Sequence, residues 1–548
     1  MSGAHHPSLR RGAADLIGGT WVEIPGDAVV SHNPAHPERV VWAGSPRVAH
    51  VDAAVRAARE ALGVWARLPL ERREGVLRRY QQVVKARQGE IADLICDETG
   101  KAMWEARGEA SILASKVDIT LERDESGGLR RVTGYRFDIS PTRVGRCFFR
   151  PHGVMAVVGP FNFPAHLPNG HIVPALLMGN TVVLKPSDKT PGVGQLLGEL
   201  FQEALEAEGF GGLGVVNVVQ GAADVASSLV SHNDVDGILF TGSWPVGRRI
   251  LEANLDRPGR IVALEMGGNN AAVVMDDADL RQAAIEIVRC AFNTTGQRCT
   301  CTRRAIIHER VAGRLIPAIC KAASQLLVGD PREGIGGHPA FMGPIIRREA
   351  REAVLGWQAE LARGGGEVLV ESSEIDVGGS GGWYLTPSVV RVERFVADGV
   401  EPAATTAKAP GGTPEPHPSG ASGGVRDAGC DMEVFGPLLR VCVVRSYEEA
   451  VEQANATKYG LAASIFTRSP EVAERFLHDA KAGCINVNNG TAGASSKLPF
   501  GGLGHSGNHR PAGSFSLDYC AYPVAGMVES GSAATLAEGM RFDDGWLA

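Results

Sequence analysis

Short apolar runs alternate with helical patterns through most of the chain from residue 154 onward. Val154–Val158 and Thr181–Leu184 have the length of strands, and Leu167–Met178 and Val193–Glu208 space their apolar residues as helices do. Strands that alternate with helices in this way form a parallel sheet whose crossover connections are the helices. The sequence therefore predicts an α/β fold with a mostly parallel sheet.

The alternation restarts after a run at Ile261–Leu264, with a strand expected at Ala271–Met275 and a helix at Ala278–Phe292. A second α/β unit is therefore expected to begin near residue 265. Leu129–Arg150 alternates polar and apolar residues, which predicts an antiparallel hairpin that stands apart from the sheet.

Two segments are expected to lack regular structure. Residues 1–15 form a loose polar tail by composition. Asp398–Asp427 is rich in Pro, Gly, Ala, Ser and Thr and has almost no large apolar residues. Such a composition predicts a disordered surface insertion, and its simplest interpretation is a loop of variable length without a role of its own.

Composition excludes several classes of protein. The chain has 548 residues, with 55 Lys and Arg against 62 Asp and Glu, so it has no basic footprint for nucleic acid or an acidic membrane. No stretch approaches the ~18 apolar residues of a membrane span, and residues 1–19 lack the apolar core of an export signal. The ten cysteines have no short regular spacing, which indicates reduced thiols. We expect a soluble cytoplasmic protein.

The strongest chemical feature is the segment Phe292–Cys299, which reads FNTTGQRC. A cysteine after a Gly-Gln turn that follows a helix is placed for exposure, and its thiolate is favoured by nearby backbone N–H groups or a helix N-terminus. Cys301 raises the alternative of a metal site, but one Cys-x-Cys without a second pair of ligands is weak for zinc, so no metal is expected. A buried structural thiol is the other alternative.

Glu265 ends an apolar run and opens the sequence EMGGNN. A carboxylate at the carboxyl end of a strand lies where open α/β sheets bind ligands, and burial there can raise its pKa so that it acts as a general base. A helix-capping or salt-bridged glutamate is the alternative, and it is the commoner role for a single glutamate.

Three further segments follow predicted strands. Phe240–Gly247 opens a helix, with Ser243 expected as its N-cap, and its free N–H groups suit a pyrophosphate. Asn162 lies on a proline-braced loop and could direct its amide at a developing oxyanion. Lys185 and Asp188 stand at a strand end, where they could grip a ribose. Each segment also has an alternative without a ligand: an ordinary strand–helix turn for Phe240–Gly247, a loop that prolines merely stiffen for Asn162, and a surface lysine for Lys185.

With Glu433–Pro437 (EVFGP) and Pro499–Gly502 (PFGG), these stretches resemble the aldehyde dehydrogenase superfamily, in that family's order. The resemblance runs from about Leu16 to the C-terminus and is interrupted mainly by the 398–427 insertion. Narrower stretches are similar to the branch that oxidises N-succinylglutamate 5-semialdehyde in bacterial arginine catabolism. They are His166–Leu176, Glu265–Asn270, Gly296–Cys301, Gly493–Ser496 and Ser506–Pro511.

The resemblance implies that Cys299 attacks the aldehyde carbon, while the Asn162 amide and the Cys299 backbone N–H stabilise the oxyanion. After hydride transfer, Glu265 would activate the water that hydrolyses the thioester. NAD is expected rather than NADP, because Asp188 would repel a 2′-phosphate. The residues expected at the cofactor are Lys185, Asp188, Gly242, Ser243, Trp244, Pro245, Val246, Gly247, Glu433 and Phe435.

The resemblance also implies an acidic semialdehyde as substrate, N-succinylglutamate 5-semialdehyde first. Succinate or glutamate semialdehyde is the alternative, and a catalytically silent scaffold is the remaining one. Gly170 would widen the entrance to the substrate pocket, since broad-specificity aldehyde dehydrogenases resemble one another in having an aromatic residue at this position. Arg298, Ser495 and Ser496 are the candidates for holding carboxylates, although a structural salt bridge is equally open for Arg298.

By the same resemblance we expect a Rossmann-like NAD domain of residues 16–128 and 151–264, and a catalytic domain of residues 265–483. Residues 129–150 and 484–548 would form an oligomerisation and bridging region. The hairpin and a strand near 484–488 would join a neighbouring subunit's sheet, so a homodimer or homotetramer is expected.

Overall fold

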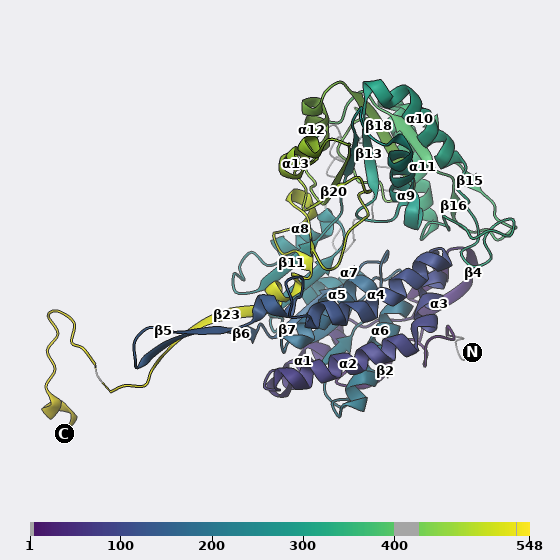
Figure 1. The fold of residues 1–548 in the computed structure, drawn as a ribbon. Coiled ribbons are helices and arrows are strands. Elements are labelled where there is room, and N and C mark those ends of the chain that lie inside the picture. Colours follow the sequence, from purple (N-terminus) through teal and green to yellow (C-terminus); the bar gives the residue numbers. More distant parts are fainter. Residues whose placement is uncertain (1–4, 399–426, 533) are drawn as a thin grey trace.

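The computed structural model describes residues 5–398, 427–532 and 534–548. Two α/β units lie one above the other in Figure 1, and a thin three-stranded sheet projects sideways from them. The predicted α/β fold and the separate hairpin are therefore confirmed, and the chain passes from the first sheet to the second between β11 and β12.

The first unit is built on a seven-stranded sheet with the order β11-β10-β7-β8-β9-β1-β2. Strands β7 to β11 run parallel, and β1 and β2 add an antiparallel edge. All residues of β7, β8 and β10 are buried, as expected for strands that helices cover on both faces. The strands of this unit are β1 (Ala14–Ile17), β2 (Thr20–Glu23), β7 (Val154–Val158), β8 (Thr181–Lys185), β9 (Val216–Val218), β10 (Gly237–Thr241) and β11 (Ile261–Glu265), with a separate β3 (Val29–Asn33) and β4 (His36–Gly44) pair. Its helices are α1 (Ala49–Trp65), α2 (Leu70–Ala86), α3 (Gln88–Thr99), α4 (Met103–Leu121), α5 (His166–Leu177), α6 (Pro191–Ala207), α7 (Ala223–Ser231) and α8 (Trp244–Glu252).

The second unit also has a seven-stranded sheet, with the order β14-β17-β18-β13-β12-β19-β20. All its strand pairs are parallel except β14 with β17. Its strands are β12 (Asn270–Val274), β13 (Thr302–His308), β14 (Glu367–Val370), β17 (Ser388–Arg391), β18 (Leu438–Val444), β19 (Ala462–Phe466) and β20 (Cys484–Val487), beside a small β15 (Glu374–Ile375) and β16 (Tyr384–Leu385) pair. Its helices are α9 (Leu280–Phe292), α10 (Glu309–Ser324), α11 (Arg348–Arg363), α12 (Tyr447–Asn455) and α13 (Pro470–Asp479).

The projecting sheet joins distant parts of the chain. Strands β5 (Tyr135–Asp138) and β6 (Arg143–Pro151) form the predicted antiparallel hairpin, and β23 (Ala521–Glu529) pairs antiparallel with β6 along nine residues. The chain continues beyond β23 to a C-terminus far from the body (Figure 1). A two-stranded ladder of β21 (Pro499–Phe500) and β22 (Ala512–Gly513) lies between β20 and β23 in sequence.

The loose tail expected at residues 1–15 is wrong for its described part, residues 5–15. Leu9 is buried in the apolar core of the first unit, and a ring nitrogen of His6 lies 3.0 Å from a carboxylate oxygen of Asp97. The residues that hold this segment are distant from it in sequence, so the polar composition of the segment alone could not predict that it is ordered.

The expected disordered insertion lies outside the described residues apart from its two ends. The ends meet, because the N–H of Asp431 donates to the carbonyl of Asp398 at 3.3 Å and the N–H of Val396 donates to the carbonyl of Gly429 at 3.0 Å. The segment therefore leaves and re-enters the second unit at adjacent points, as an insertion does.

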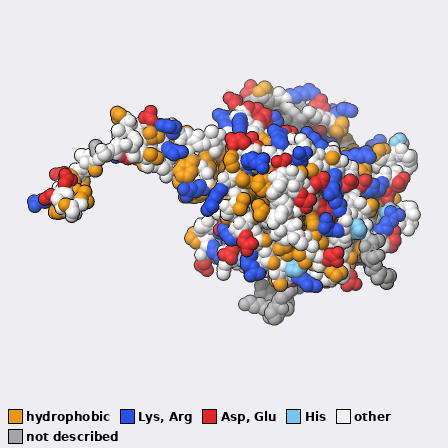
Figure 2. All heavy atoms as spheres, turned by 90° about the horizontal axis from the view of Figure 1, so that it is seen from below, with side chains coloured by type: hydrophobic (Ala, Val, Ile, Leu, Met, Phe, Trp, Pro, Cys, Tyr) orange, Lys and Arg blue, Asp and Glu red, His pale blue; other side chains and the backbone are white. Residues whose placement is uncertain are grey.

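Acidic and basic side chains are interspersed over the face of the body shown in Figure 2, and neither sign forms a patch there. Orange apolar side chains are frequent along the base of the projecting sheet. Among the described helices, none combines the length and the apolar character that crossing a bilayer requires.

Candidate functional site

Three predicted site segments leave neighbouring strands of the first sheet at the same edge. The chain continues from β7 into the loop of Asn162, from β10 into the turn at Gly242, and from β11 into the segment after Glu265. Strands β8 and β9 extend the sheet on one side of β7, whereas β10 and β11 extend it on the other. The carboxyl ends of strands at such a switch in direction form a ligand-binding crevice.

The turn before Cys299 has a strained backbone. Thr294, Thr295 and Gly296 have φ angles of 52°, 53° and 68°, so two non-glycine residues adopt the left-handed conformation in succession. Glu105 of α4 stabilises the turn by accepting hydrogen bonds from the N–H of Thr294 at 3.0 Å and from its hydroxyl at 2.8 Å. A side chain of α4 therefore supports the strained backbone that leads to Cys299.

Two side chains hold the backbone on either side of the thiol. The amide of Asn270 donates to the carbonyls of Cys299 and Cys301, both at 2.8 Å. Arg303 donates to the carbonyl of Gly296 at 2.7 Å. The N–H of Cys299 itself donates to no acceptor among the described residues, which leaves it available to a ligand.

Cys299 is half-buried as a residue, but the acidity of its thiol differs from the expectation. Burial raises its pKa to about 12, against a smaller opposite effect of the Arg298 charge. The cysteine follows a tight turn rather than opening a helix, so the predicted acidification by a helix N-terminus is absent. The resting group is therefore a thiol that must lose its proton on reaction.

Asn162 is buried at 5% exposure, yet its side-chain amide makes no hydrogen bond to any described residue. A buried polar group normally finds a partner, so an amide without one at a cleft is available for a ligand.

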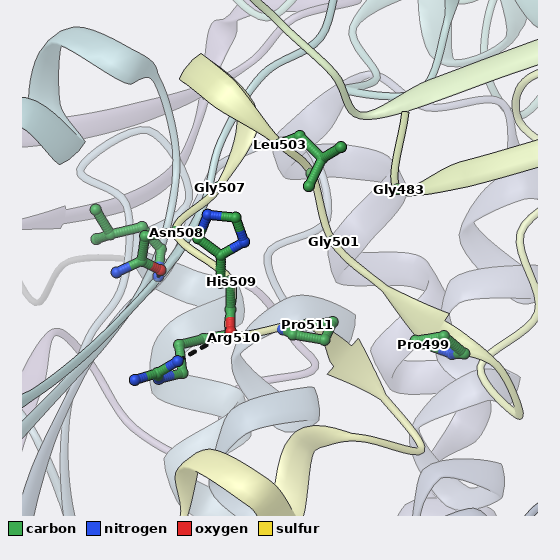
Figure 3. Close-up of a pocket in the computed structure, with 11 residues that line it drawn as sticks. Gly483, Pro499, Gly501, Leu503, Gly507, Asn508, His509, Arg510 and Pro511 are labelled. Carbon is green, nitrogen blue, oxygen red and sulfur yellow. Dashed lines mark hydrogen bonds between the residues drawn. The ribbon is translucent and has the colours of Figure 1, made fainter. Parts of the chain in front are cut away.

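Glu265 is equally buried at 5% exposure, and burial raises its pKa to about 8. One carboxylate oxygen accepts the N–H of Ala512 at 3.2 Å. The bridge between Glu265 and Gly507 brings the 499–511 segment against the end of β11. That segment and Leu264 line a cavity of about 260 Å³, shown with the exposed His509 and Arg510 in Figure 3.

The turn at Gly242–Gly247 offers fewer free donors than its sequence indicates. The N–H groups of Gly242, Val246 and Gly247 are used within the fold, and Pro245 has none. Ser243 occupies the N-cap position as predicted, but its side chain makes no capping hydrogen bond. The backbone N–H groups of Ser243 and Trp244 donate to no described acceptor, so two donors remain.

The bulk of Trp244 is accommodated by stacking. Its ring lies on that of His505, with centroids 4.1 Å apart and planes at 8°, and the side chain packs on the 504–506 turn. A Cβ at Gly247 would lie 2.3 Å from the sulfur of Met266, so a larger residue there would displace the Met266 side chain between α8 and the end of β11.

Lys185 ends β8 and is buried, and its ammonium donates to no described residue. Burial lowers the pKa of Lys185 to about 8, and Asp188 acts in the opposite direction. Asp188 is ionised, since Lys189 and Lys185 hold its pKa below the usual value in spite of its burial. These residues offer one free cationic donor and one carboxylate at the strand end.

Glu433 and Phe435 approach from the second unit. One carboxylate oxygen of Glu433 accepts the N–H of Gly268 at 3.0 Å, and burial raises its pKa to about 7. Phe435 meets Phe161 of the Asn162 loop edge to face, with ring centroids 5.7 Å apart. The two units therefore contact each other beside the proposed cofactor crevice.

The three candidates for holding carboxylates differ in their surroundings. The Arg298 guanidinium lies 5.0 Å from the ring centre of Phe163 and forms no ion pair with a described residue. The alternative of a structural salt bridge is therefore wrong within the described chain. Ser495 is exposed, and its hydroxyl accepts the N–H of Lys497 at 3.3 Å; within the described chain, neither it nor Ser496 forms a hydrogen bond with Arg298.

Helix α4 contributes residues that the motifs did not reveal. Glu105, Glu109 and Lys116 are all directed into the protein, and Lys101 just before the helix forms a buried ion pair with Glu109. The available signal was that Glu109 and Lys116 share the helical face of Leu113. Glutamate and lysine are seldom fully buried unless they are paired, so charged residues on the apolar face of a helix indicate a role in folding or function.

Cys301 is buried, and its sulfur lies 3.8 Å from the side-chain oxygen of Asn293. Across the described ranges, no group of three or more His, Cys, Asp or Glu residues is arranged to hold a metal ion.

The comparisons with known proteins agree with this geometry. The model of the aldehyde dehydrogenase family matches residues 21–396 and 427–523. The N-succinylglutamate 5-semialdehyde dehydrogenase of Sphingopyxis alaskensis is 40% identical over 521 residues, which are 95% of this chain and 98% of that protein.

Two solved structures have the same fold. HpcC from Thermus thermophilus matches with a TM-score of 0.83 at 27% identity, over 97% of this chain and 95% of that one. An indole-3-acetaldehyde dehydrogenase in complex with NAD+ matches with a TM-score of 0.81 at 26% identity, over 95% of this chain and 97% of that one. The chain belongs to the aldehyde dehydrogenase family.

Proposed function

We propose that this protein oxidises an acidic semialdehyde to its carboxylate with NAD, through a thiohemiacetal and a thioester on Cys299. N-succinylglutamate 5-semialdehyde is the first candidate substrate, after the name of the relative at 40% identity. One observation carries the proposal: the Asn162 amide and the Cys299 N–H lack partners within the described chain, beside a half-buried cysteine and a buried carboxylic acid.

In the first step the Cys299 sulfur attacks the aldehyde carbon, and the oxygen becomes an oxyanion. Asn162 and the Cys299 N–H donate to that oxygen, and each such donor is worth ~100–1,000-fold in rate. Because the thiol has a raised pKa, its proton leaves during attack. Glu265 and Glu433 are the carboxylates whose charge this thiol senses.

Bound NAD would supply the acceptor for the hydride of the thiohemiacetal carbon, which leaves a thioester on Cys299. The hydrolysis of this thioester needs a base that activates water. Glu265 then takes a proton from water as its oxygen attacks the thioester carbon, and this proton passes to the departing Cys299 sulfur, so that the carboxylic acid and the thiol are released and Glu265 is again a carboxylate. A carboxylate whose pKa lies near the working pH is suited to this exchange.

The crevice fits a dinucleotide. The unpartnered ammonium of Lys185 and the carboxylate of Asp188 would hold a ribose, and the free N–H groups of Ser243 and Trp244 would hold a pyrophosphate oxygen. Glu433 and Phe435 would flank the nicotinamide ribose. Of its two carboxylate oxygens, Glu433 uses one for Gly268, so the other is available.

The substrate end is suited to carboxylates. The unpaired guanidinium of Arg298, adjacent to the nucleophile, can bind a carboxylate through two hydrogen bonds. A Cβ at Gly170 on α5 would meet no heavy atom of the described chain within 4 Å, so this glycine leaves room for a branched substrate. The role of Ser495 and Ser496 stays a prediction.

Substrate profiling tests the proposal. The purified protein is assayed for NADH formation with N-succinylglutamate, succinate and glutamate semialdehydes, each with NAD and with NADP. The highest kcat/KM is expected with the succinylated substrate and NAD. A flat profile would contradict the substrate but not the chemistry, and absent turnover would favour a silent scaffold.

Arg298→Met should raise KM for the acidic semialdehydes by ~10–100-fold, since charge-assisted hydrogen bonds contribute ~1.5–3 kcal/mol. Because the Arg298 charge also favours the Cys299 thiolate, kcat is compared on propanal, an uncharged aldehyde. KM for propanal should not change, and Arg298→Lys should recover part of the loss. An equal loss on both aldehydes would contradict carboxylate binding.

Asp188→Ser should raise kcat/KM with NADP by about tenfold relative to NAD, because it removes like-charge repulsion of a 2′-phosphate. The Lys189 ammonium, 3.6 Å from Asp188, would then face that phosphate without its carboxylate neighbour. Initial rates with both cofactors measure the effect. An unchanged ratio would place the adenosine ribose elsewhere.

We further propose a cytoplasmic homodimer or homotetramer assembled through the projecting sheet. Tyr135, Phe137, Tyr522 and Met527 on its strands are all more than half exposed, which is unusual for a surface without a partner. Strand β20 forms an edge of the second sheet and could accept a neighbouring strand. Light scattering measures the assembly.

A further inference from the structure

Lys116 is a buried cation whose side-chain hydrogen bonds both go to one distant segment. It lies on α4 at 3% exposure, and its ammonium donates to the carbonyl of Gly513 at 2.7 Å and to the hydroxyl of Ser516 at 3.0 Å. No carboxylate of the described chain forms an ion pair with it. Burying an ammonium without a paired anion is costly, so the charge calls for a reason.

The same segment holds the proposed general base. The N–H of Ala512 donates to Glu265, and the next residue, Gly513, supplies the carbonyl that Lys116 binds. Gly513 has a φ angle of 69°, and a Cβ there would lie 2.2 Å from the carbonyl oxygen of Leu498. The two-residue segment Ala512–Gly513 is therefore held between Glu265, which accepts its first N–H, and Lys116, which donates to its last carbonyl.

The groups that face Glu265 come from several elements. They are Lys116 of α4, Cys299, Cys484 of β20 and Tyr519 of the turn before β23. Burial raises the pKa of both cysteines and of the tyrosine, so all three are neutral near pH 7. Burial lowers the pKa of Lys116 to about 8, so near pH 7 it is mostly protonated and is the one positive charge among these described neighbours.

The groups that face Lys116 are Glu265, Cys520, His166 and His171. Burial lowers the pKa of each histidine to about 3 and raises that of Cys520, so none of these three carries charge near pH 7. His171 is further fixed by Tyr519 at 2.9 Å and Thr241 at 3.2 Å. Glu265 is thus the one group in this surrounding that can become an anion beside Lys116.

We infer that Lys116 is a positioning residue for Glu265: it holds the segment Ala512–Gly513 against the carboxylate and supplies the charge that favours the ionised form of Glu265. The inference rests on the proposed hydrolytic role of Glu265. A purely structural clamp would need only a neutral donor, whereas this role needs the charge.

The test measures the pH dependence of steady-state turnover and the preceding burst of NADH in full-length variants. Lys116→Gln keeps a donor without the charge, Lys116→Met keeps neither, and Lys116→Arg keeps the charge. In the Gln and Met variants the pH at which turnover rises should move upward by about one unit, because an adjacent opposite charge lowers a carboxyl pKa by at least that much. The NADH burst should persist, and Lys116→Arg should rise at or below the wild-type pH.

Ser516→Ala is the matched control, because it removes one contact of Lys116 and leaves the charge; its pH profile should not move. An unmoved profile in Lys116→Gln and Lys116→Met would overturn the inference. Thermal unfolding shows whether each variant folds. If neither Lys116→Gln nor Lys116→Met folds, Lys116→Arg decides. A turnover that rises at a higher pH than in the wild type overturns the inference, and a turnover that rises at the same or a lower pH supports it. Wild-type protein without turnover on any semialdehyde would overturn the proposed function as well.

Discussion

Cys299→Ala is expected to remove aldehyde oxidation, with turnover reduced by ~10⁴-fold or more, because no other group supplies the covalent step. NAD binding should persist, since Lys185, Asp188 and the α8 turn come from other segments. NADH formation measures the first quantity and calorimetric titration with NAD the second.

Cys301→Ala is the matched control two residues away. Its sulfur is buried toward Asn293, so this variant should keep turnover and lose only some stability. If Cys299→Ala retained wild-type turnover, the assigned nucleophile would be wrong. If Cys301→Ala were inactive while Cys299→Ala stayed active, Cys301 rather than Cys299 would be the nucleophile.

Glu265→Gln should separate the two half-reactions. The burst of NADH should remain, while steady-state turnover falls by ~10²–10⁴-fold, because water then lacks its base. Mass spectrometry of the quenched protein should find an acyl group on Cys299. Slow turnover without an accumulated acyl-enzyme would exclude Glu265 from hydrolysis.

The wild-type pH profile follows from the same residue. Burial raises the pKa of Glu265 to about 8, so the carboxyl is mostly protonated at neutral pH and becomes a base as the pH rises. Hydrolysis should therefore increase through pH 8, and this rise should disappear in Glu265→Gln. A rise that persists in the variant would belong to another group, such as Glu433.

Much of the fold and site could be predicted because their signals are local. Strand and helix patterns depend on neighbours within a few residues, and they located β7, β8 and β10. Glu265 and the Asn162 loop follow strand ends, and parallel strands bring their carboxyl ends to one edge. The prediction failed for residues 5–15, where Leu9 lies in the core and Ala14 and Asp15 begin strand β1.

By itself, the sequence determined the family, the α/β order and the residue types available for chemistry. Only the tertiary structure decided that Lys116 meets Gly513, that Glu105 holds the turn before Cys299, and that the thiol has a raised rather than a lowered pKa. Contacts across hundreds of residues and the burial of a charge depend on how separate elements pack. Local periodicity carries no record of that packing, because it is the same whichever partner covers the helix face.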